Sequence, residues 1–215
     1  MTHLVFVHGW GFDSSLWDAI IAELPDFDCE ALDFGFSGHP KSPRANGTEP
    51  VIAIGHSLGF LWLLHEQPFA WRALVSIGGM PRFTKAADYR FGIDRRLLEA
   101  TIARFDEEPG ETLSEFLVYC GGGSPSNHID PIKLREGLHW LRQWDARHHL
   151  ADESAPLLAL YADNDAIVPK QLSHDIFGNR PNTKRVVRRD GGHALPLTEP
   201  HWCAAAIREF VENLP

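Results

Sequence analysis

The chain has 215 residues, of which 44% are hydrophobic and 23% charged, and its formal net charge is −9. This length and composition fit one globular domain with a full hydrophobic core. The acidic balance argues against a nucleic-acid partner, and no apolar run approaches the ~18 residues of a membrane span. The N-terminal "MTHLVFVHGW" lacks a signal-peptide pattern and the three cysteines are isolated, so we expect a reduced, cytoplasmic protein without a metal site.

Short apolar runs alternate with helical patterns along most of the chain. The runs predicted to be strands span residues 4–7, 29–34, 51–55, 73–79, 157–161 and 184–190. Helical spacing of apolar residues predicts helices over residues 14–24, 58–66 and 199–214. The inner runs are continuously apolar, as expected for parallel strands that are covered on both faces. The sequence therefore predicts an α/β fold with a mostly parallel central sheet of about six strands and helices on both faces.

One long stretch, residues 81–153, interrupts this alternation and contains no strand candidate. Helices are expected there over residues 93–105, 111–120 and 130–144. A helical insertion in an α/β core usually lies over the carboxyl edge of the sheet, where ligands bind. We therefore interpret residues 82–151 as a helical lid, and residues 1–81 and 152–215 as the core that carries it.

The pentapeptide "GHSLG" at residues 55–59 matches the pattern G-x-S-x-G. It follows a strand candidate and precedes a predicted helix, which is the context of a nucleophile elbow. In such an elbow the serine takes a strained backbone conformation, and small flanking residues avoid a steric clash. Taken alone, the pentapeptide could also be an ordinary glycine-rich turn at the end of a strand.

A serine nucleophile needs a histidine that takes its proton and an acid that orients the histidine. Downstream, "ADNDAIVP" ends one strand with Asp163 and Asp165, and "RRDGGHA" ends the last strand with His193. Serine, acid and histidine thus follow one another in the chain order of nucleophile-elbow hydrolases. We predict Ser57 as the nucleophile and His193 as the base, and either aspartate could reach the histidine.

The stretches "HGWG", "GHSLG", "DAIVP" and "GGHA" together resemble the motifs of the α/β-hydrolase superfamily. Within it, "LVFVHGWGFDSSLW", "GLHWLRQWDARHHL" and "HALPLTEP" resemble the pimeloyl-[acyl-carrier protein] methyl ester esterases of biotin synthesis. The resemblance implies a serine carboxylesterase without a cofactor. It favours Asp165 over Asp163 as the acid, because Asp165 directly precedes "AIVP". It also implies that the backbone N–H groups of Trp10 and Leu58 form the oxyanion hole, with the Trp10 ring as a wall of the pocket.

The resemblance further implies an acyl ester substrate carried on an acyl-carrier protein, which is strongly acidic. An enzyme of net charge −9 must meet such a carrier through a local basic surface. Half of the chain's twenty Lys and Arg residues fall between residues 82 and 150. We predict carrier docking at Arg95, Arg96 and Arg142, although the acidic "DEE" at 106–108 interrupts the patch.

Two other functions remain open for this sequence. One is a broad-specificity short-chain carboxylesterase, and the other is a non-catalytic ligand-binding protein on a hydrolase scaffold. In each case we expect a monomer without a nucleic-acid or membrane partner. We expect His8 and His56, which lie inside motifs, to pack or hydrogen-bond beside the site. The stretch 39–50 has no helical periodicity, so a helix that the family usually carries there is expected to be missing.

Overall fold

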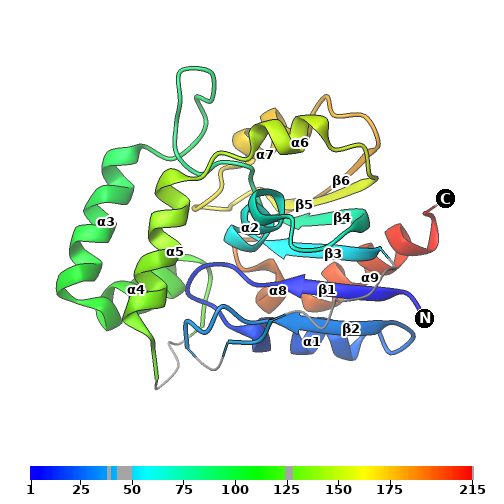
Figure 1. The fold of residues 1–215 in the computed structure, drawn as a ribbon, viewed down its shortest axis with the longest axis horizontal. Coiled ribbons are helices and arrows are strands. Elements are labelled where there is room, and N and C mark those ends of the chain that lie inside the picture. Colours follow the sequence, from blue (N-terminus) through cyan, green and yellow to red (C-terminus); the bar gives the residue numbers. More distant parts are fainter. Residues whose placement is uncertain (38–39, 43–49, 124–127, 215) are drawn as a thin grey trace.

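The computed structural model describes residues 1–37, 40–42, 50–123 and 128–214 (Figure 1). Its strands form one parallel six-stranded sheet in the order β2-β1-β3-β4-β5-β6. The strands are β1 (His3–Val7), β2 (Asp28–Leu32), β3 (Val51–His56), β4 (Trp71–Ile77), β5 (Leu157–Ala162) and β6 (Thr183–Arg188). Each strand candidate of the sequence is a strand, with ends that agree to within two residues. The predicted parallel α/β sheet is therefore confirmed.

Helices cover both faces of this sheet (Figure 1). A 3-10 turn (Ser14–Trp17) leads into α1 (Asp18–Ala22), which packs with α8 (Leu195–Thr198) and α9 (Pro200–Glu212) on one face. The other face carries α2 (Leu58–Glu66) and α7 (Lys170–Phe177), where the rings of Phe60 and Phe177 meet at 6.2 Å. The predicted helices over 58–66 and 199–214 are present, whereas α7 and α8 were not expected from the sequence.

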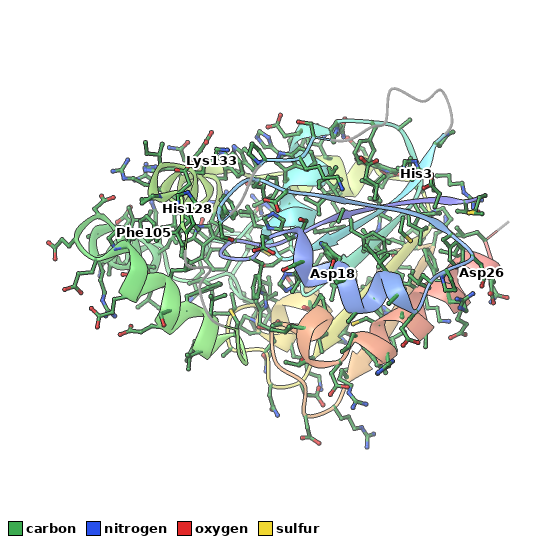
Figure 2. All side chains as sticks on the ribbon, turned by 90° about the horizontal axis from the view of Figure 1, so that it is seen from below. His3, Asp18, Asp26, Phe105, His128 and Lys133 are labelled. Carbon is green, nitrogen blue, oxygen red and sulfur yellow. The ribbon has the colours of Figure 1, made fainter. Side chains whose placement is uncertain are left out.

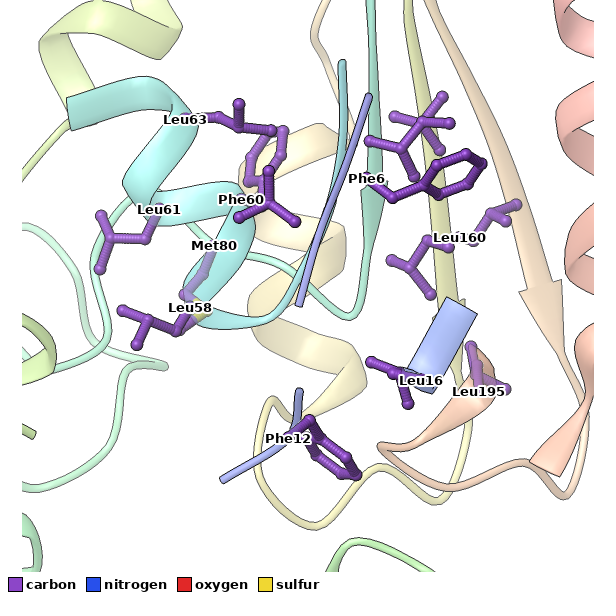
Figure 3. Close-up of a cluster of buried hydrophobic side chains, with 14 of the residues drawn as sticks. Phe6, Phe12, Leu16, Leu58, Phe60, Leu61, Leu63, Met80, Leu160 and Leu195 are labelled. Carbon is purple, nitrogen blue, oxygen red and sulfur yellow. The ribbon is translucent and has the colours of Figure 1, made fainter. Parts of the chain in front are cut away.

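The hydrophobic core lies in two layers, one on each side of the strands. Figure 3 shows Phe60 and Leu63 of α2 on one side, and Phe6, Leu16 and Leu195 on the other. All residues of β3 and β5 are buried, as a parallel strand in the middle of a two-faced layer requires. The strand β6 consists of half-buried and exposed residues, and it is the last in the order of the described strands, where it pairs with β5.

Between β4 and β5 the chain forms α3 (Arg95–Glu107), α4 (Pro109–Tyr119), α5 (Pro131–Gln143) and α6 (Arg147–Asp152), here called the α3–α6 segment. In Figure 1 the strands point toward α3, α4 and α5, which lie beyond the carboxyl edge of the sheet. Figure 2 shows Phe105, His128 and Lys133 at this end of the molecule, and His3 and Asp26 at the opposite end. These helices match the predicted ones, while α6 was not expected from the sequence.

Side-chain caps define where α3 and α5 begin. The Asp94 carboxylate accepts a hydrogen bond of 2.9 Å from the Arg96 backbone N–H. The Asp130 carboxylate accepts bonds from two backbone N–H groups of the first turn of α5, and Pro131 follows as the first helical residue. The division into a core (1–81 and 152–215) and a lid (82–151) stays a prediction. The expected absence of a helix over 39–50 falls largely outside the described residues.

Candidate functional site

Ser57 stands at the turn between β3 and α2, at the carboxyl edge of the sheet. Its backbone has φ 51° and ψ −118°, a strained conformation for a residue with a side chain. The two flanking glycines allow the close packing that holds this turn. A Cβ at Gly55 would lie 2.4 Å from the Phe60 Cα, and one at Gly59 would lie 2.2 Å from the Val7 carbonyl oxygen. The "GHSLG" stretch therefore has the backbone of a nucleophile elbow.

His193 lies between this serine and an aspartate, although the three residues are far apart in the sequence. The Ser57 hydroxyl lies 2.9 Å from His193 Nε2, and Asp165 Oδ2 lies 2.8 Å from His193 Nδ1. The hydroxyl can donate to Nε2 while the Nδ1–H donates to the carboxylate. The side chains of His193 and Asp165 are each 1% exposed, so solvent does not screen their contact.

The turn after β5 decides which aspartate meets the histidine. Asp165 Oδ1 accepts hydrogen bonds of 2.8 Å from the backbone N–H groups of Ile167 and Val168, which leaves Oδ2 facing His193. Asp163 instead forms an ion pair with Lys170, at 2.5 Å between Oδ1 and Nζ. Of the two aspartates that the residues alone left open, the structure brings Asp165 to His193.

One contact at this site was not anticipated from the sequence, and it involves Gly78. Gly78 follows β4 with φ 54°, and a Cβ there would lie 3.4 Å from both Asp165 Oδ2 and His193 Nδ1. A methyl group at this position would be in van der Waals contact with both atoms of that hydrogen bond, and the positive φ makes any substitution there strained. The signal in the sequence was the glycine pair of "SIGG", directly after a predicted strand.

The two residues expected to supply the oxyanion hole both lie next to Ser57. Leu58 is the first residue of α2, and the first N–H groups of a helix have no partner within it. A Cβ at Gly9 would lie 3.0 Å from the Ser57 Cβ, so the Gly9–Trp10 peptide passes directly beside the serine. His8 Nδ1 lies 2.9 Å from the Gly9 carbonyl oxygen. Because the C=O and N–H of a trans peptide point in opposite directions, this contact also orients the Trp10 N–H.

A cavity of about 400 Å³ opens beside the site, between the α3–α6 segment and the turn after β5. Its apolar lining includes Trp10, Leu98, Phe116, Leu138 and Ile167. Trp10 is 2% exposed and donates its indole N–H to the Leu134 carbonyl at 2.7 Å, which fixes the ring as a wall. The ion pair of Arg104 and Glu115 adds charged groups to the same lining. The cavity can therefore accommodate an apolar chain, and its lining adjoins the site through Trp10, Ala166 and Ile167 rather than through Ser57 itself.

The three arginines expected to dock a carrier lie on two helices of the α3–α6 segment. Arg135 of α5 pairs with Asp106 near the end of α3, so the two helices run antiparallel, and the start of α3 lies near the end of α5. Arg95 and Arg96 are exposed at that start, and Arg142 is half-buried near that end. Arg95 Nε donates to Glu99 at 3.0 Å, so part of its charge is already paired.

Comparisons with known proteins bear on the fold and on the family that the chain resembles. No protein-family model matches the chain. It is 28% identical to the pimeloyl-[acyl-carrier protein] methyl ester esterase of Vibrio vulnificus, over 96% of this chain and 93% of that protein. It is 27% identical to the protein of the same name from Pectobacterium atrosepticum, over 98% and 94% of the two chains. An esterase from Exiguobacterium antarcticum superposes with a TM-score of 0.85 at 18% identity, over 99% of this chain and 92% of that one.

These likenesses confirm the α/β-hydrolase fold and the resemblance to that group of esterases. They support a carboxylic ester hydrolase. Within the described residues, no group of three His, Cys, Asp or Glu side chains is placed to hold a metal ion. In the same part of the chain, none of the helices has the length and apolar character that crossing a membrane requires.

Proposed function

We propose that the chain is a serine carboxylesterase in which Ser57 is the nucleophile, His193 the base and Asp165 the residue that orients the base. The observation that carries the proposal is the hydrogen-bonded series Ser57–His193–Asp165, with distances of 2.9 and 2.8 Å, at the carboxyl edge of the sheet. An aspartate or glutamate nucleophile is not available at the elbow, because the residue at the strained position is Ser57.

The geometry supports an acyl-enzyme mechanism. His193 Nε2 takes the hydroxyl proton as Ser57 Oγ attacks the ester carbonyl, and Asp165 stabilises the imidazolium that forms. The N–H groups of Trp10 and Leu58 stabilise the negative oxygen of the tetrahedral intermediate. His193 then gives its proton to the alcohol, which leaves. Water, activated by the same histidine, attacks the acyl-enzyme, and the released acid and free Ser57 complete the cycle.

We further propose that the substrate is the methyl ester of pimeloyl-[acyl-carrier protein] in biotin synthesis. The names of the relatives support this substrate. The cavity lined by Trp10 and Ile167 supports it as well, because its apolar wall suits a polymethylene chain. In this proposal the ester end of the chain lies at the serine and the carrier end lies in solvent. The exposed Arg95 and Arg96, together with Arg142, offer an acidic carrier a basic surface on the neighbouring helices.

A broad-specificity short-chain carboxylesterase is the second candidate, and the charges near the cavity favour it. Arg95 is paired with Glu99, and Arg104, which lines the cavity, is paired with Glu115. These two arginines are therefore already partly neutralised. At the start of α4, a hydrogen bond with Glu108 and the charge of that residue raise the pKa of Glu111, which indicates crowded acidic groups. An acidic carrier would be repelled where α3 ends and α4 begins, near Glu108 and Glu111.

Two measurements test these proposals. Methanol release from pimeloyl-[acyl-carrier protein] methyl ester is compared with release from free methyl esters of graded chain length. We expect at least tenfold higher kcat/KM for the carrier-bound ester. Equal values would exclude the carrier-bound substrate and favour the broad-specificity carboxylesterase. Intact-mass and peptide analysis after treatment with a fluorophosphonate should locate one adduct, on Ser57. An adduct on another residue would overturn the serine mechanism.

A further inference from the structure

His56 is a buried histidine next to the nucleophile that the mechanism above does not use. It is the last residue of β3 and its relative exposure is 0%. Its Nε2 lies 3.1 Å from the carbonyl oxygen of His193. Because a carbonyl only accepts, Nε2 must carry the proton in this contact. Burial, and secondarily the charge of His193, lower the pKa of His56 well below its ordinary value, so it stays neutral.

The peptide bond after His193 is held at both of its polar atoms. Its carbonyl accepts from His56, and its N–H, which belongs to Ala194, donates to the Cys120 carbonyl at 3.1 Å. Cys120 is the C-cap of α4 and therefore belongs to the α3–α6 segment. His56 belongs to the sheet. The backbone of His193 is thus fixed to the core through His56 and to the inserted helices through Cys120.

The surroundings of His56 leave its ring little freedom. The Phe12 ring meets it edge-on at 5.4 Å between centroids, and a Cβ at Gly9 would lie 2.8 Å from His56 Nδ1. Among the described residues, that buried Nδ1 has no hydrogen-bond partner. The polar contact that this ring makes is therefore the one to His193. The consecutive residues His56 and Ser57 thus supply the donor that holds the proposed base and the proposed nucleophile, respectively.

We infer that His56 is a positioning residue, whose Nε2–H holds the main chain of His193 so that the imidazole stays within reach of the Ser57 hydroxyl. This inference rests on the proposed function, in which His193 is the base. Without the donor, the peptide is anchored to α4 alone and can follow that helix. Misplacing a reacting group by about 1 Å can cost on the order of 10²-fold in rate.

A pair of variants of similar length separates hydrogen bonding from packing at this position. Gln has an amide N–H where His56 has Nε2, while Met fills similar space without a donor. We expect H56M to lower kcat for a small methyl ester by about 10- to 100-fold with KM within about twofold. H56Q should recover most of that loss. H201M, at a histidine whose side chain is 82% exposed on α9, serves as the control and should match the unsubstituted protein.

Two results would overturn the inference. One is that H56M has the kcat of the unsubstituted protein. The other is that kcat falls to the same extent in H56M and H56Q while the melting temperatures of both variants are unchanged. If H56M does not fold, H56L replaces it as the variant without a donor. S57A and H193Q, measured alongside, separate a failure of the proposed serine mechanism from a failure of the inference about His56. If S57A or H193Q retains activity, the serine mechanism itself is wrong. If both lose activity but the His56 variants give one of the two results above, only the positioning role of His56 is wrong.

Discussion

The sheet core and the α3–α6 segment both contribute buried residues to the hydrophobic core, but they differ in how tightly the backbone around them is packed. In the core, the residues around Ser57 are buried, and a single methyl group at Gly55 or Gly59 would meet the backbone at less than 3 Å. In the α3–α6 segment, ion pairs such as Arg95–Glu99 and Arg135–Asp106 join side chains that are 40–61% exposed. Exposed pairs of this kind contribute about 0–1 kcal/mol each.

This difference assigns the two regions different tasks. The core holds the proposed reacting groups Ser57, His193 and Asp165 within hydrogen-bond distance of one another, so its substitutions should change the chemical step. The α3–α6 segment supplies walls and charges beside the cavity, so its substitutions should change which ester reaches Ser57. Removing a core group should therefore affect all substrates equally, whereas changing the segment should affect some and spare others.

The largest expected effect is the loss of the proposed nucleophile. Ser57→Ala should lower ester hydrolysis by roughly 10⁴- to 10⁶-fold for every ester tested, because no acyl-enzyme can form. The melting temperature should change little, since the methyl group replaces a hydroxyl at the same backbone position. Ser154→Ala, at an exposed serine, is the matched control. More than a tenth of the activity left in the Ser57 variant would contradict the nucleophile assignment.

The second effect concerns the two aspartates after β5. Asp165→Asn should lower kcat by on the order of 10³- to 10⁴-fold, because an amide cannot stabilise the imidazolium of His193. Asp163→Asn should cost less than about tenfold, because it removes only the surface pair with Lys170. Parallel kcat measurements on the two variants decide the matter, and the reverse ranking would move the orienting role to Asp163.

These two aspartates also show where sequence reasoning stops. Buried parallel strands are continuous apolar runs, so β3 and β5 could be located within two residues. The chain order of serine, acid and histidine likewise followed from the ends of the strands. The choice between Asp163 and Asp165 depends on how one turn folds. Two N–H groups at positions 167 and 168 orient Asp165. The residues alone did not reveal these bonds, and the preference for Asp165 came from the resemblance, through its place directly before "AIVP".

The helices that sequence analysis missed have a common cause. α6, α7 and α8 have six, eight and four residues, which is too short for a clear helical period of apolar residues. α7 buries only Leu172, Ser173 and Phe177, so polar residues dominate its pattern. The sequence predicted a pocket with Trp10 as a wall, but the other residues that line the cavity could not be predicted, for another reason. The cavity lies between segments such as α3 and the turn after β5, which are far apart in the chain and meet only in the fold.

An intermediate effect on stability is expected at Asp33, in the core beside His8. Its carboxylate accepts from the Ser14 and Gly35 backbone N–H groups at 2.9 and 2.7 Å. Burial raises the pKa of this carboxyl, but the two N–H bonds and the His8 ring, whose Nε2 lies 3.6 Å from Asp33 Oδ1, outweigh it, so the pKa lies well below its ordinary value. Asp33→Ala leaves both N–H groups unpaired and should cost about 1–3 kcal/mol of unfolding free energy at pH 7.

The lowered pKa also sets the sign of a pH effect at Asp33. The unfolded carboxyl titrates near ~3.9, so the folded protein gains stability from this charge above that pH and loses it as the pH falls through the folded pKa. Denaturant unfolding at pH 7, 5, 4 and 3 should show a shallower acid loss for the Asp33 variant. Asp18→Asn, at an exposed aspartate, is the control. Equal slopes for the Asp33 variant and the unsubstituted protein would contradict this account.

A smaller effect, and the first that should separate substrates, is expected in the cavity wall. Leu98→Phe adds volume to a residue that lines the cavity and is 4% exposed. It should lower kcat/KM for a long-chain methyl ester by about tenfold or more, because the larger ring takes up space that the acyl chain would fill. A methyl acetate substrate should be unaffected. Ile132→Phe, at an 81% exposed residue of α5, is the control, and equal losses on both esters would place Leu98 outside the acyl site.

The smallest expected effect tests the carrier surface on α3 and α5. Reversing the charge at Arg95, Arg96 and Arg142 should raise KM for the carrier-bound methyl ester by about 3- to 10-fold at low ionic strength, and by less at higher salt. The effect is limited because Glu99 already pairs with Arg95 in the free protein. Hydrolysis of a small free ester should be unchanged, since none of the three touches Ser57. The same reversal at Arg72, Lys184 and Arg208, away from these helices, controls for net charge. If both triple variants raise KM equally, only the overall charge matters. If neither does, the carrier binds elsewhere or not at all.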